Sequence, residues 1–381
     1  MALTLISGTR DTSNINSSRL VIDMSNEIAQ LQPNATPFTV LLKKLAKKKT
    51  IAAKFEWLED ELLPRWDLST TGCAASEVHV PVDNHAYFTI GDIVKVPSTG
   101  ECMLVSAIED EADTITVTRG FGETATAIIA AGSDLVILGN ANEEGATAPT
   151  AKTTKEEAKY NYTQIFRTPF GATETEKNSE LYGGNDIAYQ RKKKGIEHML
   201  DIERALLFGE LKQLTTGTHP RRTTRGLLKF ISTNATTGVG ALTLADFEDW
   251  LKTGFAYGSD TKVLFASGTL LSAISQLAGL RLQTVPSDTT YGISVKEYIS
   301  PFGKVNIVFH RLLEEYYDGT GVLVDLANVK YRFLEGRDTK LKTNIQANDE
   351  DSEKDEYLTE CGLEVGLEKT HALISGVTGI V

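Results

Sequence analysis

Apolar residues recur with a helical period along one long stretch of the chain, residues 185–212. Tyr189, Ile196 and Leu200 lie on one face, and Asn185 is a suitable N-cap. The pattern predicts a helix of about 27 residues, roughly 40 Å long, around which the other elements are arranged. Four consecutive basic residues interrupt its first half, so only the second half is expected to be buried along one face. They are Arg191, Lys192, Lys193 and Lys194.

A different pattern, with a period near two, runs through residues 86–139. Short stretches such as DTITVTRG and SDLVILGN alternate apolar and polar positions and are separated by glycine-containing turns. Four or five short strands at this spacing predict a small β-barrel at about residues 86–140. The flanking residues 54–85 and 140–175 are expected to be the two legs of one long loop that carries the barrel.

Helical and strand patterns alternate over residues 243–325, which predicts a compact α/β or α+β domain. Thr243 is expected to cap the helix that follows it. Strand patterns return over residues 320–381. Seven acidic side chains lie between Asp349 and Glu360, and we expect that run to be a solvated loop.

The N-terminal region has two short helical patterns and few other signals. Residues 19–31 are expected to form one helix, which ends before Pro33, and Thr36 with Pro37 begins another. The apolar side of the second helix is predicted to be Val40, Leu41, Leu42 and Leu45, and its other side carries Lys43, Lys44, Lys47, Lys48 and Lys49. The pattern is typical of an extended arm whose lysines contact nucleic-acid phosphate, an acidic neighbouring subunit or only solvent.

The composition indicates a folded protein with an uneven charge distribution. With 381 residues, the chain is expected to form two or three domains, and it has neither a signal-peptide pattern nor an apolar run long enough for a membrane span. Residues 51–150 carry 4 basic and 17 acidic side chains, net −13, and residues 151–230 carry 15 and 10, net +5. These opposite charges indicate complementarity between segments or between copies, or simply a solvated surface.

No pattern of catalytic or metal-binding residues is present in the sequence. The six histidines lack metal-site spacing, the three cysteines include no CxxC pair, and there is no phosphate-binding or nucleophile-elbow motif. We therefore expect no enzymatic activity, cofactor, metal or small-molecule substrate. Three hypotheses remain: a self-assembling structural protein, a nucleic-acid-binding protein, and an enzyme without a recognisable motif. The first accounts for the most features, and the net charge of −12 weakens the second.

Several stretches, taken in order, are similar to one known family. They include PNATPFTVLLKKL and FEWLEDELLP near the start, GDIVKVPSTGECMLVSAI and NYTQIFRTPFGATET in the middle, and the region from GRDTKLKTNIQ to LISGV at the end. In this order and spacing the chain resembles the major capsid proteins of tailed bacteriophages, which have the Hong Kong 97 fold. The resemblance covers nearly the whole chain.

The resemblance implies an α+β fold with four parts. Residues 1–50 would be an N-terminal arm, and residues 51–175 an extended loop that carries the inserted barrel. Residues 176–239 and 326–381, with the helix at 185–212, would form the peripheral domain, and residues 240–325 the axial domain. The implied function is to build the icosahedral head that encloses the phage DNA; another phage head or tail assembly protein is the alternative.

The resemblance also implies partners and surfaces. The subunit would form pentamers and hexamers in a virion capsid that assembles in the host cytoplasm, with a portal and with double-stranded DNA bound non-specifically. Because no long acidic leader precedes the arm, a scaffold would be a separate protein, or a leader would already have been removed; Met1 favours the former. The lysines at 43, 44, 47 and 48 and the four basic residues from Arg191 to Lys194 are expected to face the lumen or acidic neighbours. The residues expected at an interface with another copy are Trp57, Leu62, Leu63, Arg65 and Trp66.

Overall fold

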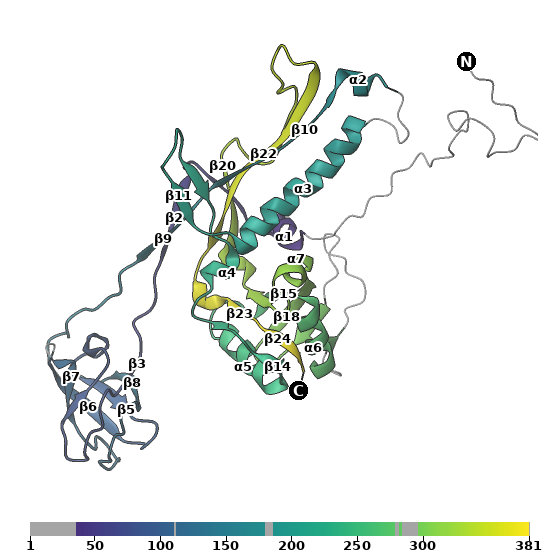
Figure 1. The fold of residues 1–381 in the computed structure, drawn as a ribbon. Helices are drawn as coiled ribbons and strands as arrows, with labels where there is room; N and C mark the ends of the chain where they lie inside the picture. Colours follow the sequence, from purple (N-terminus) through teal and green to yellow (C-terminus); the bar gives the residue numbers. More distant parts are fainter. Residues whose placement is uncertain (1–35, 110–111, 180–185, 279–281, 284–295, 381) are drawn as a thin grey trace, which may run out of the picture. The chain divides into compact units, whose positions relative to one another are not determined.

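The chain folds as two compact units (Figure 1). One unit combines Met1–Trp57 with Lys159–Val381, and the other is Leu58–Ala158, which is therefore an insertion into the first. The helix predicted at residues 19–31 and the N-cap predicted at Asn185 lie outside the described residues. The computed structural model describes residues 36–109, 112–179, 186–278, 282–283 and 296–380.

The larger unit contains a five-stranded sheet built around one long strand, β22. The spatial order is β1 (Lys47–Thr50), β20 (Val329–Leu334), β22 (Ser352–Val365) and β10 (Gln164–Thr173), with β21 (Lys340–Lys342) also paired to β22. Strand β22 is antiparallel to β10, β20 and β21, whereas β1 runs parallel to β20. Strand β10 pairs with the first part of β22 and β20 with the last part, so β10 and β22 extend beyond β20 as a ribbon (Figure 1).

Helix α3 (Asp186–Phe208) is the long helix that the sequence predicts, and it contacts β10 and β22. Its buried side chains all lie between His198 and Leu207, which confirms that only the second half is buried. The predicted end at residue 212 is wrong. Gly209 approaches the backbone of Thr224 so closely that a Cβ would lie 2.4 Å from the Thr224 carbonyl oxygen. Thus α3 ends at Phe208, and the chain continues into β11 (Lys212–Leu214), paired with β12 (Arg221–Thr223).

Helix α1 (Pro37–Leu45) packs against α3 in the main hydrophobic core of the larger unit. Phe38, Leu41 and Leu42 are buried there, but Leu45, predicted on the same side, is exposed. The helix begins at Pro37 as expected, although the Thr36 side chain makes no capping hydrogen bond. The lysines after Ala46 do not continue the helix, because Lys47–Thr50 form β1 and bond to β20.

A seven-stranded sheet forms the second layer of the larger unit. Its spatial order is β13 (Ala235–Thr236), β23 (Ala372–Ile374), β19 (Gly321–Val324), β15 (Thr261–Ala266), β18 (Lys304–Phe309), β17 (Lys296–Ile299) and β16 (Leu282–Gln283). A separate pair joins β14 (Gly240–Leu242) to β24 (Val377–Ile380). Strands β23 and β24 belong to the C-terminal segment, so this segment contributes to both sheets of the unit rather than to the first alone.

Three helices accompany this second sheet: α5 (Leu244–Gly254), α6 (Gly268–Ala278) and α7 (Arg311–Tyr316). Thr243 caps α5 as predicted, since its hydroxyl accepts a 3.1 Å hydrogen bond from the Asp246 N–H in a capping box. Phe247, Trp250 and Leu251 of α5 are buried in the core of this layer. The predicted alternation of helices and strands is therefore confirmed from α5 through β15 to α6, whereas residues 279–281 and 284–295 lie outside the described residues.

The inserted unit is a six-stranded barrel with its own core, as the sequence predicts. Its strands are β3 (Trp66–Leu68), β8 (Asp134–Asn140), β5 (Asp92–Lys95), β6 (Cys102–Glu109), β7 (Thr114–Thr118) and β4 (His79–Pro81). A bridge between Ser69 and Val82 joins the two outer strands and closes the barrel. The predicted start at residue 86 is too late, because β3 and β4 are only three residues each and carry no alternation long enough to recognise.

The remaining elements are short. Strand β2 (Lys54–Glu59) pairs with β9 (Glu157–Tyr162), and two short helices are α2 (Glu174–Lys177) and α4 (Leu227–Phe230). Among the helices of the described residues, none combines the length and the apolar character needed to cross a membrane.

Candidate assembly surfaces

The segment that leads into the barrel exposes large apolar side chains. Leu58 is 70% exposed, Leu62 93% and Trp66 56%, while Leu63 is only partly exposed and Arg65 is exposed. Residues 60–65 are in neither a helix nor a strand. Three exposed large apolar residues within nine positions form a patch of the kind that marks protein–protein contacts. We call residues 58–66 the leg patch.

Trp57, predicted with this group, already has partners in its own chain. Its ring stacks on Phe55 at a centroid distance of 6.2 Å and lies 6.0 Å from the ring of Phe230 on α4. Trp57 is therefore partly covered within the larger unit, which the sequence could not show because Phe230 is far away along the chain.

Trp66 lies on the outer face of the barrel. It is opposite Val136 in the β3–β8 pairing, and Leu138, two residues further along β8, is 59% exposed. Residues two apart on a strand point to the same face. The leg patch thus continues onto an apolar strip of the barrel surface.

The lysines at the end of α1 are largely engaged within the larger unit. Lys43 donates a 3.0 Å hydrogen bond to Thr339 and lies over the ring of Tyr331; burial lowers the pKa of its ammonium group. Lys47 forms an ion pair with Asp338, whose carboxyl pKa is held below its usual value by Lys47 and other partners although burial alone would raise it. Lys48 is exposed, and Lys44 also has contacts.

The four basic residues of α3 divide into two kinds. Arg191 donates a 2.8 Å hydrogen bond to Asp355 on β22, and Lys194 pairs with Glu197 one turn along the helix at 2.6 Å. Lys192 is exposed and Lys193 is partly exposed. Lys192 is therefore the most solvent-facing charge of the group, and Lys193 has no ion pair among the described residues.

Strand β22 carries buried carboxylates that pair with basic residues from other elements. The acidic run predicted as a solvated loop becomes part of this strand from Ser352 onward, so that prediction is wrong. The ion pairs are Asp355 with Arg191, Glu356 with Arg167 and Lys342, Glu360 with Arg337, and Glu364 with Lys330 and Arg332. All four carboxylates are almost completely buried. Partners far away in the sequence make this burial possible, and a local pattern cannot reveal them.

Metal-binding clusters and reactive thiols are two marks of a catalytic site that the described residues allow to be checked. They contain no group of three or more His, Cys, Asp or Glu side chains that could hold a metal ion. Burial raises the pKa of the Cys361 thiol to about 12 and also raises that of Cys73, which disfavours the reactive thiolate.

Comparison with known proteins identifies the family. The model of the SU10 major capsid protein family matches residues 6–378, almost the whole chain. The chain belongs to the SU10 major capsid protein family. A relative, the major capsid protein of Pseudomonas phage PaMx41, is 28% identical over 297 residues, which cover 74% of this chain and 71% of the relative. This capsid protein therefore forms the shell of a phage and is part of the virion capsid.

Solved structures agree on the fold of the capsid protein. The capsid of a native GTA particle has a TM-score of 0.51 at 11% identity and covers 96% of this chain and 98% of its own. The capsid of Myoviridae phage XM1 has a TM-score of 0.50 at 11% identity, with coverages of 95% and 98%. At this identity the likeness concerns the fold alone: it is the Hong Kong 97-like fold that the sequence resemblance implied.

The pairing of Arg191 with a buried carboxylate gives a testable difference within the basic run of the capsid protein. We expect Arg191→Gln to lower the free energy of unfolding by about 1–2 kcal/mol, because among the described residues Asp355 would keep only the Asn344 N–H as a hydrogen-bond donor. Lys192→Gln, one residue away and exposed, should change it by less than about 0.5 kcal/mol. Denaturant unfolding of unassembled subunits measures both values. Equal effects would contradict the assigned role of Arg191.

Proposed function

We propose that the subunit builds an icosahedral head of pentamers and hexamers that encloses double-stranded phage DNA. In this proposal residues 1–50 are the N-terminal arm and residues 51–175 an extended loop that lies on a neighbouring subunit. Residues 176–239 and 326–381 form the peripheral domain and residues 240–325 the axial domain, to which β23 and β24 add strands. The observation that carries the proposal is the exposed leg patch.

The leg patch needs a partner for energetic reasons. Covering a leucine or tryptophan side chain that is otherwise in water contributes about 1.5–3 kcal/mol. Leu62, at 93% exposure, gains almost all of that only when another molecule covers it. In a closed shell every subunit can supply the partner surface for the next, which makes a second copy the natural occupant.

The charge distribution supports the same arrangement. Residues 51–150 have a net charge of −13, and residues 151–230, which include α3 and the β11–β12 pair, have a net charge of +5. A loop from the acidic segment that lies over the basic segment of a neighbour would bring opposite charges together. Such complementarity favours the correct partner and register over alternatives.

The remaining parts of the proposal concern other partners. In the two basic groups Lys44, Lys47, Lys48 and Lys192 are exposed and Lys193 is partly exposed. These lysines would contact packaged DNA or acidic neighbours without sequence preference. A separate scaffolding protein and a portal would complete assembly in the host cytoplasm, as the resemblance implies. We assign no enzymatic activity to the subunit.

The decisive experiment changes the leg patch alone. We expect Leu62→Asp to raise the subunit concentration needed for shell assembly at least about tenfold, because one lost apolar contact of 1.5–3 kcal/mol recurs at every interface. Sedimentation velocity and negative-stain electron microscopy of the assembly reaction would measure this. Circular dichroism should be unchanged, since Leu62 has few contacts in its own chain.

Ile128→Asp is the matched control. Ile128 is also in the inserted unit and is 72% exposed, but it lies outside the leg patch. We expect this variant to assemble like the unmodified protein. Normal assembly of Leu62→Asp, or equal loss in both variants, would overturn the assignment of the leg patch.

A further inference from the structure

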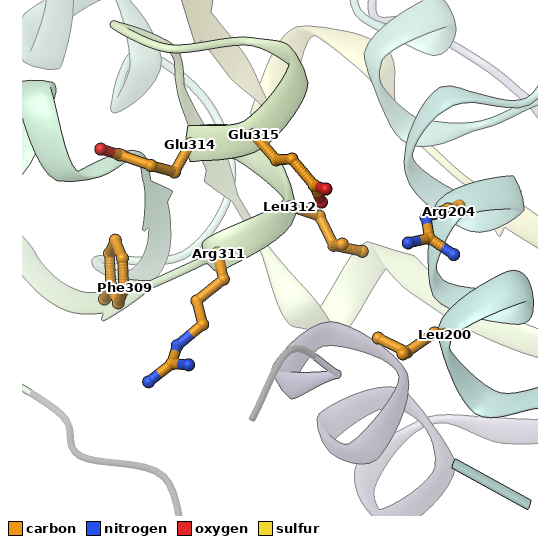
Figure 2. Close-up of a pocket in the computed structure, with 7 residues that line it drawn as sticks. All are labelled: Leu200, Arg204, Phe309, Arg311, Leu312, Glu314 and Glu315. Carbon is orange, nitrogen blue, oxygen red and sulfur yellow. The ribbon is translucent and has the colours of Figure 1, made fainter. Parts of the chain in front are cut away.

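A cavity of 640 Å³ lies in the larger unit where α3 faces the junction of β18 and α7 (Figure 2). Leu200 and Leu312 line it and belong to one small buried hydrophobic cluster, and Phe309 is 42% exposed. Its remaining lining residues are charged: Arg204, Arg311, Glu314 and Glu315. An apolar surface with charges of both signs around it suits an amphipathic segment.

The two arginines offer unused hydrogen-bonding capacity. The Nε of Arg204 is buried and has no hydrogen-bond partner among the described residues, although its Nη1 is 3.4 Å from Asp201. Arg311 is exposed at the start of α7. Figure 2 shows the two guanidinium groups on either side of Leu200 and Leu312. A carboxylate that enters the cavity would find a cationic donor on either side.

The first turn of α1 is bonded to residues that adjoin the cavity lining in sequence. The first N–H groups of α1, those of Phe38 and Thr39, donate to the Glu203 carboxylate at 3.0 and 2.7 Å. Glu203 is adjacent in sequence to Arg204. The Glu203 carboxylate also accepts a 2.8 Å hydrogen bond from Nε2 of His310. His310 lies between Phe309 and Arg311 in the sequence. The start of α1 is therefore held at Glu203 and His310, which are next in sequence to the lining residues Arg204, Phe309 and Arg311.

We propose that this cavity binds residues 19–31 of the same chain as an amphipathic helix. In RLVIDMSNEIAQL, Leu20, Met24, Ile28 and Leu31 share one helical face, and the acids Asp23 and Glu27 lie beside it. The apolar face packs against Leu200 and Leu312. The carboxylates of Asp23 and Glu27 pair with the two arginines of the cavity. The inference rests on the cavity and on the position of α1, not on the assembly proposal above.

The connection between the two segments is short enough. Only residues 32–36 separate Leu31 from α1, and five residues span at most roughly 17 Å. A linker of this length gives the tethered segment an effective concentration in the millimolar range. The subunit's own segment therefore has an advantage over the same segment of another copy.

Photo-crosslinking of the full chain tests the proposal. The photoreactive residue p-benzoylphenylalanine replaces Met24 on the apolar face or, as the matched control, Asn26 on the opposite face. After irradiation, mass spectrometry locates the crosslinked peptides in a mixture of isotopically light and heavy subunits. We expect Met24 to crosslink to residues 200–204 or 309–315 of the same chain, with at least fivefold higher yield than Asn26.

Other results would overturn the proposal. Crosslinks from Met24 to a different region, mixed light–heavy crosslinks alone, or equal yields at both positions would each do so. A second variant tests the charges: Arg311→Glu, at an exposed position where folding is not affected, should lower the Met24 yield at least threefold. An unchanged yield would overturn the role of Arg311.

Discussion

Replacing Glu203 by alanine is expected to lower the free energy of unfolding of the subunit by about 3–5 kcal/mol. The Glu203 side chain is fully buried on α3 and accepts hydrogen bonds from the N–H groups of Phe38 and Thr39 and from His310. Its removal leaves three buried donors without this acceptor and opens a space between α1, α3 and β18. Losses of this kind are among the largest that single substitutions cause.

The effect should be concentrated at α1. The first N–H groups of a helix have no partner inside the helix, so α1 depends on Glu203 for two of them. Hydrogen exchange of residues 37–45 should therefore rise more than that of α5 in the Glu203→Ala variant. Because α1 also fixes the start of the N-terminal segment, the variant should lose the intramolecular crosslink from Met24.

Two further variants test whether the hydrogen bonds of Glu203 account for the loss of stability. Glu197→Ala, on the same helix with a side chain that is 39% exposed, should change the free energy of unfolding by less than about 1 kcal/mol. Glu203→Gln keeps the volume and one acceptor oxygen, and we expect an intermediate loss in urea denaturation. A Glu203→Ala variant as stable as the unmodified protein would show that the three hydrogen bonds contribute no net stability.

Local patterns in the sequence predicted the elements whose causes are local. The capping box of Thr243 and Asp246 lies within four residues, and α5 begins where the sequence indicates. The burial of α3 only after His198 follows from the charges at 191–194. The alternation of apolar and polar residues at 114–118 predicted the strand that the structure shows as β7. Together with the neighbouring patterns it predicted the barrel.

Long-range pairing decided what local patterns could not predict. The acids of 352–360 look like a solvated run, but Arg191, Arg167 and Arg337 neutralise them in β22. The strand β1 consists of three lysines and a threonine and exists because β20 supplies its hydrogen bonds. The role of Glu203 depends on residues more than a hundred positions away, and nothing near it in the sequence indicates it.

Arg119→Leu is expected to unfold the barrel locally, which is the second large loss of stability that we predict. Arg119 donates to both oxygens of Glu101 at 2.8 Å and to the carbonyl oxygens of Ala74, Glu77 and Ala127. The Glu101 side chain is completely buried, and burial alone would raise its pKa, but Arg119 and the N–H groups of Ala127 and Gly120 lower it below its usual value. The pair therefore joins three loops of the barrel.

The loss should be about 3–5 kcal/mol, because the substitution leaves a buried carboxylate without its counter-charge. The free energy of unfolding of a small domain is itself only about 5–15 kcal/mol, so this loss is a large part of it. Hydrogen exchange should therefore rise throughout residues 66–140 and stay unchanged in α3 and α5, since the barrel is a separate unit with its own core. Lys95→Met, at an exposed position of β5, is the control and should leave exchange unaltered.

The double variant Arg119→Leu/Glu101→Leu distinguishes the effect of the unpaired buried carboxylate from that of the lost hydrogen bonds. Removing both members of a buried ion pair eliminates the uncompensated carboxylate, so part of the lost stability should return. The backbone groups that the pair bonded stay unsatisfied, so the recovery should be incomplete. If the double variant were less stable than Arg119→Leu alone, the buried charge would not be the cause, and the lost hydrogen bonds of the three loops would account for the whole effect.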